Sequence, residues 1–356
     1  MFIYLIMKNI LVTGGAGFIG SHTCLVLLEK GYKIFVIDSF ENSSPRSLAR
    51  VLELHKKKTN KSIDQLKIFK GNLCDKNFLR EVFKFIGNLN KKIDGVIHFA
   101  GLKSVTNSIL NPLLYWRTNV LGTINLLDIM KEYNCDNFVF SSSATIYDQK
   151  ENILLKENGK LSPINPYANT KFTIEMILKD LSKSSSKSLK IASLRYFNPI
   201  GAHESGLIGE YPKGIPNNIF PLITNTALGL QKELNIYGND WPTKDGTPVR
   251  DYIHVMDLAE SHIKILEYLF SNKSTFLTLN IGTGIGTSVL KLINTFERTN
   301  NVKIRYQFAK RREGDTAFLV ADNSLLLSKF NYKPKRGLED MCRDGWKWIS
   351  LNPNGY

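Results

Sequence analysis

The first two hundred residues of this 356-residue chain alternate between short apolar runs and longer segments of helical length. Each apolar run is short enough for a strand, and the segments between the runs allow several helical turns. A repeated strand–helix pattern requires a parallel sheet, because each connection must cross back over the sheet, and helices then cover both faces. The expected strands are 9–13, 33–38, 66–71, 95–101, 137–142 and 190–197, and the expected helices are 18–30, 45–56, 76–89, 111–134 and 166–185.

The alternation stops near residue 198, where a stretch rich in Gly, Pro and Asn covers 198–218. Shorter elements follow and end in an expected helix near 339–350. The pattern predicts an α/β protein with a Rossmann-type, doubly wound parallel sheet in a first domain, residues 1–197. A smaller, mostly helical second domain is expected in residues 198–356, with residues 250–270 packing back on the first domain.

The chain is basic, with a formal net charge of +15, but its lysines are dispersed. Only short clusters occur, such as "HKKKTNK" at 55–61, and the sequence contains no zinc-finger, RNA-recognition or basic-helix pattern. A dispersed positive surface is typical of a solvated, Lys-rich exterior, although its field also attracts anionic substrates such as a diphosphate. We therefore expect no nucleic-acid partner.

The four cysteines and six histidines lack any spacing typical of a metal site. Cys24, Cys74, Cys135 and Cys342 form no CxxC pair, so we expect reduced thiols in a cytoplasmic protein and no bound metal. No apolar run reaches the ~18–20 residues that cross a bilayer, so no membrane partner is expected. The opening "MFIYLIM" lacks a basic leader, and "MKNILVTGG" reads as a complete first strand, so Met1 and Met7 both remain candidate starts.

A glycine-rich turn, "LVTGGAGFIGSH" at 11–22, joins the first expected strand to the first expected helix. Gly14, Gly17 and Gly20 have the spacing G-x-x-G-x-x-G, which suits a tight turn, close approach of backbone to a pyrophosphate, and close packing of helix on strand. Asp38 ends the second expected strand, where a carboxylate accepts hydrogen bonds from ribose hydroxyls and repels a 2′-phosphate. The combination predicts NAD in preference to NADP.

The stretch "NPYANTK" places Tyr167 and Lys171 four residues apart in the expected helix 166–185, so they share one face. A free phenol has a pKa of ~10 and is a poor base at neutral pH, but a neighbouring ammonium favours the phenolate. Ser143, at the end of the expected strand 137–142, can hydrogen-bond a substrate hydroxyl where open α/β sheets bind ligands. In this context the pair predicts hydride transfer coupled to removal of a hydroxyl proton.

Four motifs of the first domain resemble the extended short-chain dehydrogenase/reductase family: the glycine turn, "HFAG" at 98–101, "SSSAT" at 141–145, and "YANTK". Sugar-nucleotide dehydratases of that family carry a Thr-Asp-Glu type triplet where this chain has a Ser-Ala-Thr run. Neither Ala144 nor Thr145 supplies the carboxyl group that elimination of water needs. A net reductase would more often favour NADPH, which Asp38 disfavours.

Further motifs narrow the resemblance to the UDP-sugar 4-epimerases of that family, over about residues 8–355. They include "LRYFNPIGAH", "GIPNN", "IYGNDWPTKDGTPVRDYIHVMDLA" and "RREGDTAF". The resemblance implies reversible epimerisation at C4 of UDP-glucose and UDP-galactose through a transient 4-keto sugar, with NAD tightly bound and not consumed. It also implies that Tyr167 takes the proton of the 4-hydroxyl, that Lys171 tunes Tyr167, and that Ser143 and Thr145 lie near that hydroxyl.

The same resemblance assigns binding residues. The substrate half suits UDP, because arginines supply forked donors for a diphosphate, a carboxylate accepts from ribose hydroxyls and an aromatic ring packs on uracil. The implied substrate residues are Ser143, Tyr167, Asn198, Asn218, Tyr237, Arg250, Arg312, Asp315 and Leu319. The implied NAD-binding residues are Gly14, Gly17, Phe18, Ile19, Gly20, Asp38, Asn42, Asn72, Leu73, Phe99, Ala100, Gly101, Lys103, Ser141, Tyr167, Lys171 and Tyr196.

Three positions depart from the pattern of those epimerases. Asn72 replaces an Asp that contacts the adenine, and its amide oxygen can still accept from the adenine amino group. Tyr147 and Asp148 replace the usual Tyr-Gly, which alters the edge of a loop. Leu319 stands where a large Tyr crowds the 2-position of the sugar and a small Cys admits N-acetyl sugars, so leucine leaves that choice open.

Several alternatives remain at this point. A 4-epimerase acting on UDP-N-acetylhexosamines or UDP-pentoses would share the motifs. A non-catalytic module that binds NAD or a UDP-sugar would not require the set of Ser143, Tyr167 and Lys171. A homodimer is expected from the family, with 76–89 and 111–134 as candidate interface helices.

Overall fold

The computed structural model describes residues 7–59, 65–89, 91–148, 153–184, 189–214, 216, 218–273, 276–312 and 314–356. Its contacts divide the chain into two compact units. The first contains Met1–Ser142, Asn165–Ser193 and His262–Leu277, and the second contains Ser143–Ile164, Leu194–Ser261 and Thr278–Tyr356.

The units interleave along the chain, whereas the sequence predicts two consecutive domains, 1–197 and 198–356. Residues Ser143–Ile164 group with the second unit, and His262–Leu277 group with the first. Within the first unit, the ring of His262 lies 4.9 Å from that of Phe99, measured between centroids. Contacts between segments far apart in the sequence set these boundaries, so a change of composition along the chain is a poor guide to them.

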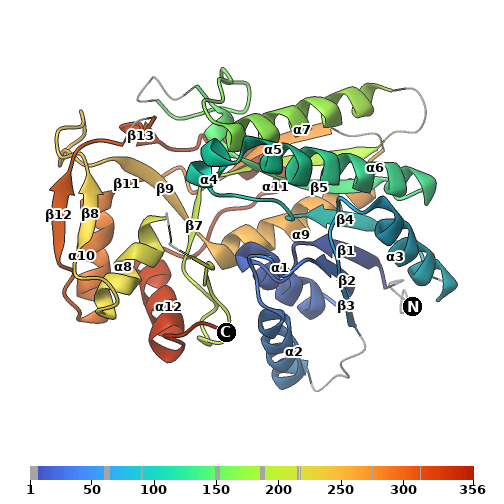
Figure 1. Cartoon of the computed structure of the whole chain (residues 1–356), viewed down its shortest axis with the longest axis horizontal. Coiled ribbons are helices and arrows are strands. Elements are labelled where there is room, and N and C mark those ends of the chain that lie inside the picture. Colours follow the sequence, from blue (N-terminus) through green and yellow to red (C-terminus); the bar gives the residue numbers. More distant parts are fainter. Residues whose placement is uncertain are drawn as a thin grey trace. The chain divides into compact units, whose positions relative to one another are not determined.

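A seven-stranded sheet is the largest element of the fold (Figure 1). Its strand order is β10-β6-β5-β4-β1-β2-β3, and the pairs β1–β2, β2–β3, β1–β4 and β4–β5 are parallel. The order reverses at β1, which lies between β2 and β4, and ligands bind at such a switch point in open α/β sheets. The strands are β1 Asn9–Thr13, β2 Lys33–Asp38, β3 Leu66–Lys70, β4 Gly95–His98, β5 Asn137–Ser143, β6 Lys190–Tyr196 and β10 Phe276–Ile281.

Helices follow these strands nearly where the sequence predicts them. The helix α7 begins at Pro166 because the side chain of Asn165 accepts a hydrogen bond from the backbone N–H of Ala168 at 2.9 Å, and proline suits the first helical position. The expected helix 111–134 contains a π-helical segment, η1, between two α-helical segments. The bounds are α1 Phe18–Glu29, α2 Pro45–Thr59, α3 Lys76–Asn88, α4 Val105–Leu110, α5 Pro112–Tyr115, η1 Trp116–Leu121, α6 Gly122–Glu132 and α7 Pro166–Lys183.

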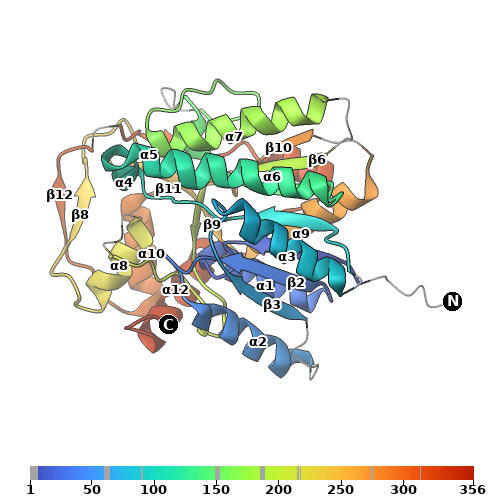
Figure 2. The ribbon, with the colours of Figure 1, turned by 45° about the vertical axis from the view of Figure 1, so that its right-hand side comes forward.

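The strands β1, β2 and β4 are buried on both faces because helices cover both faces, whereas β3 at the edge of the sheet has no buried residue. Helices α1 and α2 pack against each other, α3 packs against α6, and α7 packs against η1 (Figure 2). Leu11 and Phe35, together with α3 residues such as Leu79 and α6 residues such as Leu126, form one buried cluster. Ile10 and Ile34 are equally buried but alternate with those strand residues, so they point to the opposite face. This arrangement confirms the predicted Rossmann-like α/β fold.

The second unit combines helices with short strands. The strand β9 pairs with β7, β11 and β13, and a separate two-stranded ribbon joins β8 to β12 in parallel. Helices α8, α10 and α12 contribute to a buried cluster beside these strands. The strands are β7 Asn198–Ile200, β8 Leu234–Tyr237, β9 Val249–His254, β11 Gly286–Ser288, β12 Tyr306–Ala309 and β13 Phe318–Leu319; the helices are α8 Ile219–Ala227, α10 Val289–Asn300, α11 Ser324–Phe330 and α12 Leu338–Leu351. The helix α9, Val255–Ser271, begins in the second unit and continues into the first.

The glycine turn requires glycine at two of its positions. Gly14 has φ +70°, and a Cβ built on it would lie 2.7 Å from the backbone N of Ala100. A Cβ on Gly20 would lie 2.3 Å from the carbonyl oxygen of Gly14. Both obstacles are backbone atoms, which cannot rotate away as the end of a flexible side chain can.

Replacement of Gly20 by Ala is therefore expected to lower the free energy of unfolding by about 2–3 kcal/mol or more, because the turn must shift to relieve the overlap. Gly87→Ala is the matched control, since a Cβ on Gly87 meets nothing within 4 Å and the residue lies in α3. That variant should be unchanged or up to about 1 kcal/mol more stable. Urea unfolding of both variants makes the comparison, and equal stabilities would contradict the proposed overlap.

Candidate active site

The glycine turn leaves the N-terminus of α1 open to a ligand. Gly17 is the N-cap residue, no side chain caps the helix, and the first turn contains no acidic side chain. The first N–H groups of a helix have no partner within the helix and carry the positive end of its dipole. An uncapped helix N-terminus that follows a turn in which Gly14 and Gly20 let backbone segments approach closely is the kind of site that a pyrophosphate occupies.

Asp38 lies at the end of β2 and is almost fully buried. Its carboxylate accepts hydrogen bonds from the backbone N–H of Ala16 at 2.9 Å, the backbone N–H of Phe40 at 2.9 Å and the hydroxyl of Ser43 at 2.8 Å. The carboxylate therefore holds the glycine turn to the loop that follows β2, and Phe40 has φ +58° in that loop. A carboxylate has about four acceptor sites, so it retains capacity for a ribose hydroxyl.

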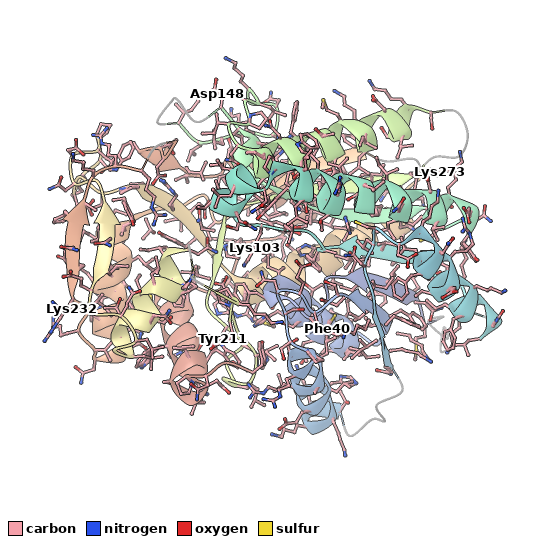
Figure 3. All side chains as sticks on the ribbon, viewed as in Figure 1. Phe40, Lys103, Asp148, Tyr211, Lys232 and Lys273 are labelled. Carbon is pink, nitrogen blue, oxygen red and sulfur yellow. The ribbon has the colours of Figure 1, made fainter. Side chains whose placement is uncertain are left out.

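Several other residues predicted to bind NAD lie on loops after strands of the large sheet, and the rest lie in α1 or β6. The backbone N–H groups of Phe99 and Ala100 donate to the carbonyl of Thr13, which shapes the loop after β4. Lys103 is exposed in that loop and is labelled in Figure 3. Asn42 and Asn72 are exposed, Leu73 is buried, Phe18 and Ile19 are half-buried in the first turn of α1, and Tyr196 is buried in β6.

Lys171 is buried beneath Tyr167 on one face of α7. Its ammonium donates a hydrogen bond to the backbone carbonyl of Ser141 in β5, with 2.6 Å between Nζ and O. The same Nζ lies 5.9 Å from the centre of the Tyr167 ring and 4.9 Å from that of Phe140. Burial lowers the pKa of Lys171 to about 8, and the negative charge of Glu175 acts in the opposite direction.

The end of β5 carries the serine run. Ser143 is buried, and its hydroxyl oxygen accepts from the backbone N–H of Thr145 at 3.2 Å and from the hydroxyl of Thr145 at 3.0 Å. Ser141 and Ser143 are two residues apart in a strand and so point to the same side of it. The structure thus places Tyr167 and Lys171 together, and Ser143 and Thr145 together.

A buried polar network, which the sequence analysis missed, supports this region. His98 Nδ1 lies 2.6 Å from Thr13 Oγ1, and His98 Nε2 lies 2.9 Å from Thr123 Oγ1. The hydroxyl of Thr123 donates to the carbonyl of Asn119 at 2.6 Å, so Nε2 is the protonated ring nitrogen and Nδ1 accepts from Thr13. Burial, with a smaller contribution from the charge of Lys171, lowers the pKa of His98 to about 3.

Asn119 links this network to α7, the helix that carries Tyr167 and Lys171. Its side-chain amide donates to the hydroxyl of Thr170 at 3.0 Å, and that hydroxyl donates to the carbonyl of Tyr167 at 2.7 Å. The amide also donates to the carbonyl of Leu102 and accepts from its N–H. Asn119 lies in the π-helical segment η1, and such segments often mark functional sites. No local motif identifies this residue, because its partners come from distant parts of the sequence.

In the second unit, the predicted UDP-binding residues other than the two amides form two groups. Arg250 forms an ion pair with Asp315, and it pairs in the sheet with Leu319 of β13. The guanidinium of Arg312 stacks on the ring of Tyr237, with 3.8 Å between its central carbon and the ring centre. Two predicted substrate residues of opposite charge therefore bind each other, which satisfies part of the hydrogen-bonding capacity of both.

The two predicted amides differ in their surroundings. The side-chain oxygen of Asn198 is buried and accepts no hydrogen bond from the described residues. A buried acceptor of this kind is costly unless a ligand or water satisfies it. Asn218 is exposed at the N-cap of α8, and its side chain makes no capping bond. Asn198 is therefore the better placed of the two to meet a ligand donor.

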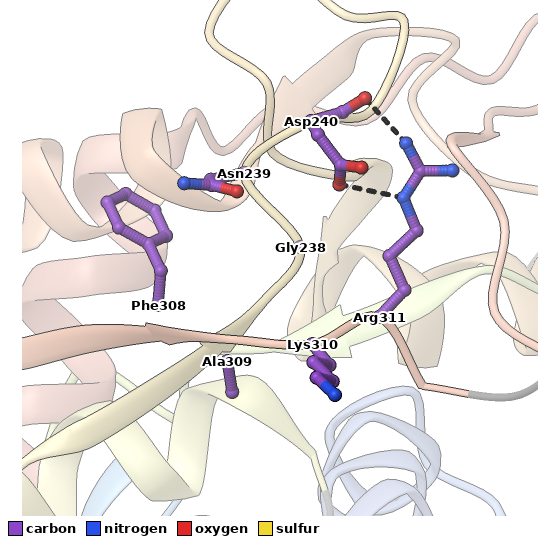
Figure 4. A pocket seen from close by; sticks show the side chains of 7 residues that line it. All are labelled: Gly238, Asn239, Asp240, Phe308, Ala309, Lys310 and Arg311. Carbon is purple, nitrogen blue, oxygen red and sulfur yellow. Dashed lines mark hydrogen bonds and ion pairs between the residues drawn. The ribbon is translucent and has the colours of Figure 1, made fainter.

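A pocket of about 340 Å³ lies at the end of the β8–β12 ribbon (Figure 4). Arg311 donates from Nε to the carboxylate of Asp240 at 2.8 Å, and its guanidinium stacks on Trp241 at 4.1 Å. The residues that line this pocket lie between Tyr237 and Arg312 in the sequence, but none of them is a predicted site residue. Its lining residues are Gly238, Asn239, Asp240, Phe308, Ala309, Lys310 and Arg311.

Within the described ranges, no three His, Cys, Asp or Glu side chains are grouped so that they could hold a metal ion. None of the described helices combines the length and the apolar character needed to cross a bilayer.

The fold and the site define a nucleotide-binding α/β enzyme of the short-chain dehydrogenase/reductase type. The model of a protein family described as GDP-mannose 4,6 dehydratase matches residues 11–345 of this chain. That match covers both units, so the likeness is not confined to the nucleotide-binding turn.

Full-length relatives are more specific. "UDP-glucose 4-epimerase 2" of Arabidopsis thaliana is 47% identical over 98% of this chain and 97% of its own. "Bifunctional UDP-glucose 4-epimerase and UDP-xylose 4-epimerase 1" of Pisum sativum is 46% identical over the same shares. A crystal structure of a UDP-glucose 4-epimerase from Stenotrophomonas maltophila, with bound NAD and formylated UDP-arabinopyranose, is 41% identical with a TM-score of 0.90, covering 98% of this chain and 99% of that one. The chain belongs to the UDP-glucose 4-epimerase family.

The buried, neutral state of His98 predicts a pH dependence of stability. The unfolded chain binds a proton near pH 6.5, whereas the folded chain does not until about pH 3, so folding loses free energy as pH falls below 6.5. Between pH 7 and pH 5 this residue should cost the wild-type protein about 2 kcal/mol.

The variant His98→Gln keeps a donor and an acceptor but removes this proton. We expect it to be less stable at pH 7 and to lose about 2 kcal/mol less than the wild type between pH 7 and pH 5. Urea unfolding at both pH values measures the difference. An equal loss in the two proteins would show that His98 is already charged in the fold.

Proposed function

We propose that this chain is an NAD-dependent UDP-glucose 4-epimerase that interconverts UDP-glucose and UDP-galactose through a transient 4-keto sugar. The observation that carries the proposal is the burial of the Lys171 ammonium next to the Tyr167 ring at the end of β5, in a chain related over its full length to such epimerases. The two residues share one helix face, so the charge acts directly on the phenol.

The first unit offers a site that fits NAD. The N-terminus of α1 is uncapped and follows the close-packed glycine turn, which suits a pyrophosphate, and the carboxylate of Asp38 at the end of β2 suits an adenosine ribose. Asn72 is exposed, and its side-chain oxygen accepts from the backbone N–H of Cys74 at 2.9 Å, so the amide nitrogen points elsewhere. When bound, NAD would supply reversible hydride transfer at C4, which allows the hydride to return to the opposite face of the sugar.

The side chains of this chain handle the proton. Tyr167 removes the proton of the sugar 4-hydroxyl as phenolate, and the Lys171 ammonium stabilises that phenolate by its charge. Ser143 and Thr145 hydrogen-bond the reacting hydroxyl and fix its position. The phenol then returns its proton when the keto group is reduced, so Tyr167 acts once in each direction and no net oxidation occurs.

The second unit anchors UDP in this proposal. Arg312 with Tyr237 and Arg250 with Asp315 supply two permanently charged guanidinium groups and an aromatic face. The unsatisfied oxygen of Asn198 supplies an acceptor. Firm anchoring of the diphosphate matters because the sugar must turn over while it remains bound.

Leu319 is the residue that bears on which sugars the enzyme accepts. Leu319 is buried in β13 next to Arg250, so its side chain is held in place. Its intermediate size does not decide between hexoses and N-acetylhexosamines, and the name of the Pisum sativum relative includes a pentose substrate. The alternative, a 4-epimerase of UDP-N-acetylhexosamines or UDP-pentoses, therefore differs only in the sugar that Leu319 and its neighbours accept.

Purified protein should convert UDP-galactose to UDP-glucose without added nicotinamide cofactor. Tyr167→Phe should lower kcat by roughly 10²–10⁴-fold because it removes the proton-transfer group. The mass of the cofactor released on denaturation serves as the control for NAD content, and it should be the same in both proteins. No conversion by wild-type protein that retains NAD would overturn the proposal.

The same assay, run as a substrate panel, separates the alternatives. We expect kcat/KM to be highest for UDP-glucose and UDP-galactose. A higher value for UDP-N-acetylgalactosamine or UDP-xylose would favour the alternative reading of the substrate pocket. Binding of these compounds without conversion of any would instead indicate a non-catalytic module.

The proposal includes a homodimer in the cytoplasm. All four cysteines are free thiols, as in proteins of reducing compartments. Apolar side chains are exposed on consecutive helices of the first unit, including Leu110 and Leu113, which are 74% and 68% exposed. Such a patch is typical of an interface. Its members are Ile109, Leu110, Leu113, Leu114, Leu121, Ile124 and, on α7, Met176; Phe85 on α3 and Leu89 at the C-cap of α3 are also exposed.

Light scattering after size exclusion should give about twice the chain mass of 40.4 kDa for the wild type. Leu113→Glu should shift the protein toward the monomer, because a charge in an apolar interface is not solvated. Leu351→Glu is the control, since Leu351 is similarly exposed at the end of α12. A monomeric wild type would contradict this part of the proposal and leave the activity untouched.

A further inference from the structure

We propose that Glu175 is a positioning residue of the active site: it is the counter-charge that keeps Lys171 an ammonium ion and so sustains the effect of Lys171 on Tyr167. The inference deepens the proposed epimerase function and rests on it for its kinetic consequences. Its structural part, a buried acid–lysine coupling on α7, stands on the geometry of the first unit.

Glu175 continues the row that Tyr167 and Lys171 begin. The three residues are spaced by four along α7, so they lie on one face, one turn apart. Glu175 is buried, and its carboxylate accepts a hydrogen bond from the hydroxyl of Ser142 at 2.6 Å. Two consecutive residues of β5 therefore bind these side chains. The carbonyl of Ser141 accepts from Lys171, and the hydroxyl of Ser142 donates to Glu175.

The groups around the Lys171 ammonium show why a counter-charge is needed. The packed elements present the phenol of Tyr167, the neutral imidazole of His98, the ring of Phe140 and the carbonyl of Ser141. None of these carries a formal negative charge while Tyr167 is protonated. Burial alone disfavours an ammonium, and the carboxylate of Glu175 offsets that cost.

The rate of catalysis is expected to depend on the protonation state of Lys171. Lys171 stabilises the Tyr167 phenolate only while it holds its proton. The rate should therefore fall as pH rises through the pKa of Lys171, which is about 8. Without the charge of Glu175, Lys171 loses its proton at lower pH. The alkaline side of the pH–rate profile should then move toward neutrality.

The decisive variant is Glu175→Gln, which removes the charge but keeps an oxygen that can accept from Ser142. We expect the alkaline side of its kcat/KM profile to lie about one pH unit lower than in the wild type, with rates near neutrality less affected. At a fixed pH on that side, this shift corresponds to about a tenfold loss. Glu175→Asp, which keeps the charge, should restore most of the profile.

Ser142→Ala is the control for a purely structural role. It removes the hydrogen bond to Glu175 and keeps the carboxylate, so its profile should resemble that of the wild type on the alkaline side. If Ser142→Ala shifts the profile as much as Glu175→Gln does, Glu175 acts through packing and the inference is overturned.

A second readout does not depend on activity. The pKa of Lys171 can be followed by NMR of protein with isotope-labelled lysine, with Lys171→Met used to assign the signal. The titration of Lys171 should occur at lower pH in Glu175→Gln. An unchanged titration in that variant would overturn the inference even if the wild type is a fully active epimerase. A shifted titration in a protein without epimerase activity would support the coupling and overturn only the proposed function.

Discussion

The hydrogen bond from the Lys171 ammonium to the carbonyl of Ser141 ties α7 to the carboxyl end of β5. An ammonium is costly to bury, so its position is determined by the few groups that can satisfy it. The parallel sheet provides such groups, because the carboxyl ends of its strands meet at one edge, close to the switch point at β1. The bond to the strand fixes where the ammonium lies relative to the phenol, which is four residues away on the same helix.

The elements that carry the site were predictable because their signals are local. Apolar runs mark the strands, the glycine spacing marks the turn before α1, and Asn-Pro marks the start of α7 at Pro166. The partners of His98 and Asn119 were not predictable, because they come from strands and helices far apart in the chain. Glu175 is an intermediate case, since its spacing from Lys171 is visible in the sequence but its burial is not.

The predicted substrate residues show a second limit of prediction from the sequence. The sequence identifies Arg250, Asp315 and Arg312 as charged groups that suit UDP, and their roles stay predictions. What the sequence does not contain is that Arg250 and Asp315 pair with each other, while Arg312 stacks on Tyr237. Pairing of this kind depends on the register of β9 with β13, which long-range contacts decide. The β10 strand escaped prediction for a similar reason, since it joins the sheet from a region without strand–helix alternation.

The family model carries the name of a dehydratase, yet the chemistry at the end of β5 argues for epimerisation. Dehydration needs an acid for the leaving hydroxyl and a base for a carbon-bound proton. Here Ala144 has no polar group, and the hydroxyl of Thr145 donates to Ser143. The carboxylate of Glu175 belongs to the same sheet edge, but it is buried, bonded to Ser142 and two helical turns from Tyr167. In the proposed mechanism it serves the charge balance of Lys171, and the single phenol of Tyr167 moves protons to and from the sugar.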